Sequence, residues 1–232
     1  MKTLFCLQPE FANTREAMSV IRGCRALGWD YVCKRECPSD AIPVGSVEYC
    51  EQYLPKADGT IDFFPYFLRG HLHRRMELAY RLGEPDALPT FYKDATRWKS
   101  SRWTSRVVPA GEKVPEDILF YQSTAVLWEQ EWRYYVADRV VLSSGWYDGQ
   151  DEDEPAPPLP YICWPDGYCG AVDFGRFRFT ENGQTHFALV EAHAPFACGW
   201  YGEDHLAYTM WLAEGWAYWQ ANPFVFRLPN GR

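Results

Sequence analysis

The sequence of 232 residues lacks a long hydrophobic run. No window approaches the roughly 18 apolar residues that a membrane-spanning helix needs, so we expect no membrane anchor. The opening "MKTLFCLQPE" is broken early by Gln8, Pro9 and Glu10, which leaves it too short for the apolar region of an export signal. We therefore expect a soluble, cytoplasmic protein.

Positive charge is also scarce, because the formal net charge is −8. This balance argues against general binding to nucleic acid or to anionic membranes. Cysteines are not scarce, but the Cys33–Cys37 spacing has no second pair at zinc-finger distance. Without an export signal, reduced thiols are expected rather than a disulfide framework. Zinc between Cys163 and Cys169, which flank a "PDG" turn, is the alternative.

What is abundant is aromatic and apolar character. Aromatic residues make up 17% of the chain and hydrophobic residues 47%. Such a composition excludes a largely disordered chain and favours deep aromatic packing or an aromatic-lined cleft.

The first 85 residues predict an α/β lobe. A strand over 2–7 is followed by a helix over 13–28 and by a second strand over 30–34, an order typical of a parallel pair. Asn13 is the expected N-cap, with Glu16 three residues later, and Gly28 is the expected stop. Residues 69–83 have a helical pattern, whereas residues 38–68 have no clear one.

Residues 86–232 predict a second, β-rich lobe. Strands are expected near 88–94 and 117–127, and over 131–147 with a turn near Ala137–Asp138. Asn182–Gly183 predicts a hairpin turn between two further strands. Residues 149–160 read as an acidic, proline-rich surface loop, and 203–221 as a closing helix with an aromatic face. The expected fold class is α+β, with a cleft between the two lobes.

A basic segment follows the first strand of the second lobe. Its cations are Lys93, Arg97, Lys99, Arg102 and Arg106, against Asp94 as the single acid. A solvated basic surface is one interpretation. The alternative is a phosphate-binding strip, because cations at the mouth of a cleft neutralise phosphate charge.

The segment "WEQEWRYYV" alternates charged and aromatic residues. Glu129, Glu131 and Arg133 are two apart, so a regular strand places them on one face. That face is either a surface ion-pair ladder or, in a cleft, a site for a polyphosphate and its cations.

The hairpin carries two carboxylates and an imidazole near its open end. Counted outward from the turn, Asp173 and Glu191 fall near each other on neighbouring strands, and His193 points the same way as Glu191. Converging carboxylates repel unless a cation lies between them, and Mg²⁺ with substrate phosphates suits such oxygen ligands. For His193 a hydrogen-bonded structural role is the alternative to a metal ligand.

In this order, "PTFYKDATRWKSSRW", "STAVLWEQEWRYYV" and "AVDFG…HFALVEAHAPFACGWYG" resemble the ATP-grasp fold. The resemblance is closer to a compact branch, found in phages and bacteria, that is named for two arginines and a lysine. It covers residues 88 to about 203, and the first lobe is similar to the family's pre-ATP-grasp lobe only in pattern.

The resemblance implies ATP and Mg²⁺ as cofactors, and roles for individual residues. Lys93 and Lys99 would contact the phosphates, the backbone from Tyr121 through Gln122 and Ser123 to Ala125 would form the adenine hinge, and Arg133 would reach the phosphate or acyl group. Glu131 would belong to the nucleotide site, and Asp173, Glu191 and His193 to the metal site. His193 replaces the family's Asn. Arg75, Arg176 and Arg178 are candidates for the second arginine.

The implied activity is ATP-dependent ligation of a carboxylate to an amine, on small molecules or peptides, through an acyl phosphate. A nucleotide-binding protein without ligase activity, regulatory or defence-related, is the alternative, because His193 departs from the family pattern. A nucleic-acid-binding protein that uses the basic segment is a third hypothesis, against which the net charge speaks.

Overall fold

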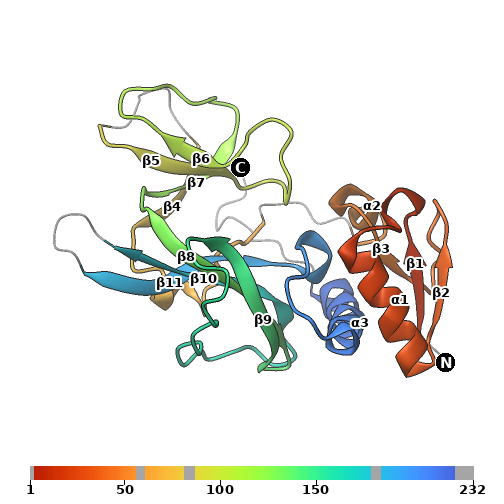
Figure 1. Cartoon of the computed structure of the whole chain (residues 1–232). Helices are drawn as coiled ribbons and strands as arrows, with labels where there is room; N and C mark the ends of the chain where they lie inside the picture. Colours follow the sequence, from red (N-terminus) through yellow and green to blue (C-terminus); the bar gives the residue numbers. More distant parts are fainter. Residues whose placement is uncertain (1–2, 56–60, 81–86, 179–183, 223–232) are drawn as a thin grey trace.

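The computed structural model describes residues 3–55, 61–80, 87–178 and 184–222, and these form three β-sheets and three α-helices (Figure 1). Two sheets are antiparallel and one is parallel, which confirms the predicted α+β class. Within these ranges, no helix combines the length and apolarity that crossing a bilayer requires.

The N-terminal lobe, here residues 3–55, has the predicted strand–helix–strand opening. β1 (Leu4–Leu7) pairs in parallel with β2 (Asp30–Cys33) and β3 (Ile42–Val44), and α1 (Arg15–Leu27) joins the first two strands. A short helix, α2 (Val47–Glu51), follows β3.

The ends of α1 correct one detail of the prediction. Thr14, not Asn13, is the N-cap, and its hydroxyl accepts a hydrogen bond from the Ala17 N–H at 3.3 Å. Gly28 ends the helix as predicted, in the left-handed region at φ 66°. Because the helix begins later than expected, Glu16 has no reciprocal capping role, and its carboxylate accepts instead from the Trp200 N–H at 3.1 Å.

The predicted helix over 69–83 is wrong. Only Arg69–His71 are helical, as the 3₁₀ turn η2, and Met76–Tyr80 form the strand β4. β4 pairs with a later strand, and its alternation of Met76 and Leu78 with Glu77 suits a half-buried strand. Residues 81–83 of this expectation lie outside the described residues.

Two antiparallel sheets make up the rest of the β structure (Figure 1). The upper sheet has the order β4-β7-β5-β6 and adds β5 (Thr90–Asp94), β6 (Arg106–Val108) and β7 (Leu119–Thr124). The lower sheet has the order β11-β10-β8-β9 and consists of β8 (Trp128–Ala137), β9 (Val140–Gly149), β10 (Cys169–Arg178) and β11 (Thr185–His193).

The expected turn after Ala137 is confirmed, and Asp138 and Arg139 there have φ values of 42° and 71°. The β10–β11 hairpin is confirmed through its two strands, while its Asn182–Gly183 turn lies outside the described residues.

Two aromatic cores tie the parts together. One lies around the lower sheet and includes Phe63, Phe64, Tyr121, Trp132 and Phe174. β4 belongs to the upper sheet and Phe63 to this core, so the boundary expected at residue 85 does not separate the sheets. We propose that the first lobe ends before residue 61.

The second core joins the N-terminal lobe to the lower sheet through α3 (His205–Ala221), the predicted closing helix. The Trp211 indole of α3 donates to the Val136 carbonyl at 3.0 Å. α1 and α3 approach so closely that a Cβ at Gly23 would lie 2.0 Å from the Thr209 hydroxyl oxygen, so this position requires glycine.

Segment 149–160 is attached to the lower sheet rather than to the cleft. Asp151 to Asp153 are exposed, as predicted, but the Glu154 carbonyl accepts from the Trp132 indole at 3.1 Å and the Pro157 carbonyl from Tyr134 at 2.6 Å. All eight cysteines are free thiols, including the exposed Cys163.

Candidate functional site

The predicted convergence of the hairpin carboxylates is confirmed. Asp173 on β10 and Glu191 on β11 are direct cross-strand partners, and a register irregularity follows Asp173. One ligand atom from each of Asp173, Glu191 and His193 lies within 4.8 Å of the others. The cross-strand pairing thus gathers two carboxylates and one imidazole at the end of the hairpin.

Each carboxylate has a cationic partner from another strand. Arg133 on β8 binds Asp173 through two hydrogen bonds, Nε to Oδ1 at 2.8 Å and Nη2 to Oδ2 at 2.7 Å, and both side chains are buried. Lys93 on β5 binds Glu191 through Nζ to Oε2 at 2.7 Å. The first pair lies within the lower sheet, whereas the second connects the two sheets.

His193 lies between the carboxylates, with Nε2 at 3.2 Å from Asp173 Oδ2 and at 3.2 Å from Glu191 Oε1. Burial opposes its protonation, but the Glu191 and Asp173 charges outweigh burial and raise the pKa of His193. Burial would raise the pKa of Glu191, yet Lys93 and His193 hold this pKa well below its usual range. Arg133 and His193 likewise lower the pKa of Asp173 against its burial. Both acids are therefore ionised at neutral pH.

The predicted common face of Glu129, Glu131 and Arg133 is only partly right. The β8–β10 pairing passes from Gln130 to Trp128 and skips Glu129, so a bulge reverses the alternation there. Glu129 pairs with Arg178 at 3.4 Å and with Arg176 at 3.7 Å, away from the carboxylate cluster.

Glu131 remains beside the cluster. Burial, followed by the Asp173, Asp148 and Glu191 charges, raises the pKa of Glu131 to about 8. The half-buried carboxyl of Glu131 is therefore largely protonated at neutral pH, unlike its two neighbours on the hairpin.

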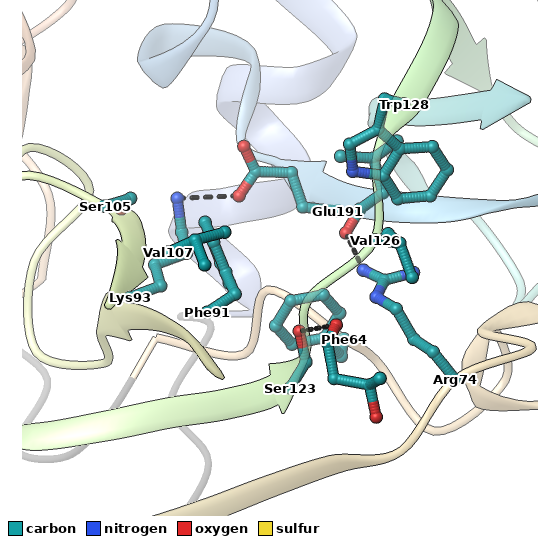
Figure 2. Close-up of a pocket in the computed structure, with 12 residues that line it drawn as sticks. Phe64, Arg74, Phe91, Lys93, Ser105, Val107, Ser123, Val126, Trp128 and Glu191 are labelled. Atoms are coloured by element: carbon teal, nitrogen blue, oxygen red, sulfur yellow. Dashed lines mark hydrogen bonds and ion pairs between the residues drawn. The ribbon is translucent and has the colours of Figure 1, made fainter. Parts of the chain in front are cut away.

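A pocket of about 260 Å³, here called the sheet pocket, lies between the two antiparallel sheets (Figure 2). Phe91 and Val107 come from the upper sheet, and Trp128 and Val190 from the lower one. Lys93 and Glu191 form one side, joined by their ion pair. The pocket therefore combines flat apolar walls with a charged side, the arrangement that a base linked to phosphates requires.

Arg74 is a pocket residue that the sequence reasoning missed. Its guanidinium donates to the Leu189 carbonyl at 2.5 Å and to the Val190 carbonyl at 3.1 Å, and it lies 5.0 Å from the Trp128 ring centroid (Figure 2). Burial lowers the pKa of Arg74 to about 10, which still leaves it charged at neutral pH. The expectation of a helix hid Arg74, because Arg74 lies in an irregular segment before β4, where His73 has a φ of 48°.

The residues expected to form the adenine hinge do not all lie in one pocket. Ser123 lines the sheet pocket, whereas Tyr121 packs in the first core and donates to the Ile61 carbonyl at 3.0 Å. Gln122 lines neither the sheet pocket nor the pocket described next. β7 pairs with β4 on one side and with β5 on the other, so the backbone outside these ladders begins after Thr124.

A second pocket of about 460 Å³, here called the lobe pocket, lies between the N-terminal lobe and the lower sheet. Lys93 and Glu191 line it as well, so their ion pair stands between the two pockets. Lys99 and Arg133 also line it. Lys99 is exposed and has no ion-pair partner among the described residues, whereas Arg133 is held by Asp173 and by the faces of the Tyr147 and Tyr201 rings.

The other cations of the basic segment line neither the sheet pocket nor the lobe pocket. Arg102 pairs with Asp117, and Arg106 pairs with Glu112 at 3.3 Å, in exposed contacts. Only Lys93 and Lys99 of the basic segment line the sheet or the lobe pocket, so the segment is not a continuous phosphate-binding strip.

The three candidates for a second arginine also lie elsewhere. Arg75 pairs with Glu77, Arg176 with Glu154 and Arg178 with Glu129, and none of the three lines either pocket. Arg74 is the arginine of this region that lines the sheet pocket.

The donor set of the carboxylate cluster fits a small divalent cation under two conditions. Asp173, Glu191 and His193 offer two carboxylates and an imidazole within bridging distance. His193, whose pKa is raised, must be neutral with an unprotonated Nε2 to bind a metal, because Nε2 is the atom that faces both carboxylates. Lys93 and Arg133 already balance the two carboxylate charges, so a cation there is favoured when a phosphate draws the Lys93 ammonium away from Glu191.

Comparison with known proteins agrees with this arrangement of sheets. The crystal structure of a RimK domain protein ATP-grasp from Sphaerobacter thermophilus DSM 20745 superposes with a TM-score of 0.50 and 12% sequence identity, covering 93% of this chain and 98% of that chain. At this identity the likeness shows the fold, which is the ATP-grasp fold.

Comparison with family models assigns the chain to a narrower group than the fold. The model of the family "ATP-grasp domain, R2K clade family 2" matches residues 71–211, more than half of the chain. The chain therefore belongs to this family of ATP-grasp domains. No curated protein matches the chain.

Proposed function

We propose that this protein is an ATP- and Mg²⁺-dependent carboxylate–amine ligase that forms ADP and phosphate. The observation that carries the proposal is the Lys93–Glu191 ion pair, which lines both pockets. A nucleotide in the sheet pocket would direct its phosphates toward Lys93, and a carboxylate substrate in the lobe pocket would meet the phosphates at the same place.

The side chains then have distinct tasks. Phe91 and Trp128 would hold the base, with the backbone after Thr124 as its hydrogen-bonding edge. Lys93 and Lys99 would bind phosphate oxygens, and Asp173, Glu191 and His193 would hold Mg²⁺. Arg133, fixed by Asp173, would present positive charge to the reacting carboxylate.

ATP supplies the phosphoryl group that activates the substrate carboxylate as an acyl phosphate. The amine nitrogen then forms the new bond to the acyl carbon, the acyl carbon–oxygen bond to phosphate breaks, and the nitrogen loses its proton to solvent. The protein contributes position, charge and exclusion of water, because an acyl phosphate hydrolyses in contact with water.

The test is turnover with a panel of carboxylates and amines, in which ADP, phosphate and the amide product are measured by mass spectrometry. We expect product that depends on ATP and Mg²⁺ and that disappears in Glu191→Gln. Glu154→Gln is the matched control, because Glu154 pairs with Arg176 outside both pockets. Absence of ADP and phosphate release across the panel would contradict ligase activity.

A nucleotide-binding protein without ligase activity is the second candidate. It is favoured by His193 and by the balanced charges of the carboxylate cluster, which need no metal for neutrality. Thermal stabilisation by ATP that needs no Mg²⁺ and survives Glu191→Gln would support this candidate over the ligase.

A further inference from the structure

The wall that the N-terminal lobe contributes to the lobe pocket carries a single charged side chain. Glu16, in the first turn of α1, is the one charged residue among the residues of 3–55 that line this pocket. Its neighbours on the wall are mostly apolar, and the hydroxyl oxygens of Thr14 and Ser46 accept from backbone N–H groups of their own helices. A single charged group on such a wall fixes the orientation of a ligand, because it leaves one place for a group of opposite charge.

The Glu16 carboxylate is held in place and retains one available oxygen. Oε1 accepts from the Trp200 N–H at 3.1 Å, which ties α1 to the turn after the lower sheet. Oε2 has no hydrogen-bond or ion-pair partner among the described residues. A half-buried carboxylate with one fixed and one available oxygen is preorganised to accept a hydrogen bond from a cation.

The side of the pocket beside the carboxylate cluster carries positive charge. Lys99 has no ion-pair partner among the described residues, while Lys93 is paired with Glu191, which also lines the pocket. Arg133 is held in place by its two hydrogen bonds to Asp173. The lobe pocket therefore favours an anion near Lys99 and a cation at Glu16.

The lobe pocket is also lined with aromatic rings. Trp98 and Phe196 lie edge to face, with centroids 6.0 Å apart, and Phe11 stands on the N-terminal lobe wall. Rings of this kind contribute binding energy to a ligand through burial of apolar surface.

We infer that the lobe pocket binds a primary amine with a large apolar substituent, and that Glu16 recognises its ammonium group. The assignment of this amine as the acceptor of the ligase rests on the proposed function. The binding site itself does not, and it is testable without turnover.

The test uses 2-phenylethylamine and 2-phenylethanol, two probes of nearly equal shape of which only the amine carries charge at neutral pH. Each is titrated calorimetrically into the full-length protein, with and without a non-hydrolysable ATP analogue and Mg²⁺. We expect the amine to bind about tenfold more tightly than the alcohol, as for a charge-assisted hydrogen bond. Glu16→Gln should abolish this preference and leave the affinity for the alcohol unchanged.

The Gln variant is chosen because its amide oxygen still accepts from the Trp200 N–H, so the unfolding midpoint should be unchanged. Glu10→Gln is the matched control, since Glu10 pairs with Arg35 at the surface and lines neither pocket. This control should retain the preference for the amine. Equal affinities in the wild-type protein, no binding of either probe, or a preference that survives Glu16→Gln would overturn the inference.

The two proposals fail separately. A Glu16-dependent amine preference without ADP formation on any substrate supports the amine site and contradicts the ligase. ADP formation with an amine acceptor whose KM is unchanged in Glu16→Gln supports the ligase and overturns the role of Glu16.

Discussion

The sheet pocket and the lobe pocket meet at the Lys93–Glu191 ion pair but have different origins. The sheet pocket is lined almost wholly by residues within 71–211, the range that matches the R2K clade family. The lobe pocket takes one wall from the N-terminal lobe, outside that range. Under the proposed function, the pocket within the family range would bind the nucleotide and the wall outside it would select the substrate.

The ion pairs at the two sides of this junction differ as well. The Arg133–Asp173 pair is buried, with 4% and 1% of the side chains exposed, while 12% and 19% are exposed in Lys93–Glu191. Arg133 is consequently a buried side chain fixed on the side of the lobe pocket. Lys93 is more accessible, as the exchange of Glu191 for a phosphate under the proposed function requires.

The largest expected effect comes from breaking the buried pair. Arg133→Met removes the bidentate partner of the buried Asp173 carboxylate and leaves it only His193, so the free energy of unfolding should fall by about 3–5 kcal/mol. Denaturant unfolding measures this change. Arg102→Met, which removes an exposed pair with Asp117, should cost less than about 1 kcal/mol. Similar losses in the two variants would contradict the structural role assigned to Arg133.

The next effect separates phosphate binding from amine binding. Lys93→Met should weaken the affinity for ATP with Mg²⁺ by about 10- to 100-fold, because a charge-assisted contact with phosphate is lost. The affinity for 2-phenylethylamine should change little. Calorimetric titration measures both, with Lys113→Met, an exposed lysine outside the two pockets, as the control. An unchanged ATP affinity would remove Lys93 from the phosphate site.

A pair of aromatic variants sharpens the contrast between the pockets. Phe91→Ala should weaken nucleotide binding by about tenfold through the loss of contact with the base, and leave amine binding intact. Phe11→Ala, on the lobe pocket, should do the reverse. Competition with a fluorescent ATP analogue and titration with 2-phenylethylamine measure the two affinities. If either variant weakens both ligands equally, the pockets do not act separately.

The last expected effect is on the pH dependence of stability. Glu131 has a pKa raised to about 8 in the folded protein, against a model-compound value of 4.5. As the pH rises above 4.5 the unfolded chain releases this proton first, so the folded state loses stability progressively until about pH 8. Glu131→Gln should remove this loss, so the free energy of unfolding of the variant should rise relative to that of the wild type between pH 5 and pH 8. Parallel pH profiles in the two proteins would show that Glu131 titrates normally.

Much of the fold could be predicted from local pattern. The parallel opening, the long hairpin and the closing helix each depend on periodicity and on turn or capping residues close by in the chain. β4 could not be predicted, because its partner β7 lies some 40 residues further along and an apolar pattern of this length suits a helix or a strand.

Some features of the candidate site likewise follow from the sequence alone, and others only from the tertiary structure. Alternation along a hairpin brings Asp173 opposite Glu191, so the sequence alone determined that two carboxylates converge and that His193 joins them. Only the tertiary structure decided which cations meet them, since Lys93 and Arg133 come from separate strands. It also decided that a bulge turns Glu129 away, that Arg74 enters the sheet pocket and that Glu16 faces the lobe pocket. The physical reason is the distance along the chain over which each effect acts. Strand alternation depends on neighbouring residues. Charge neutralisation and pocket shape depend on side chains that only the packing of sheets and lobes brings together.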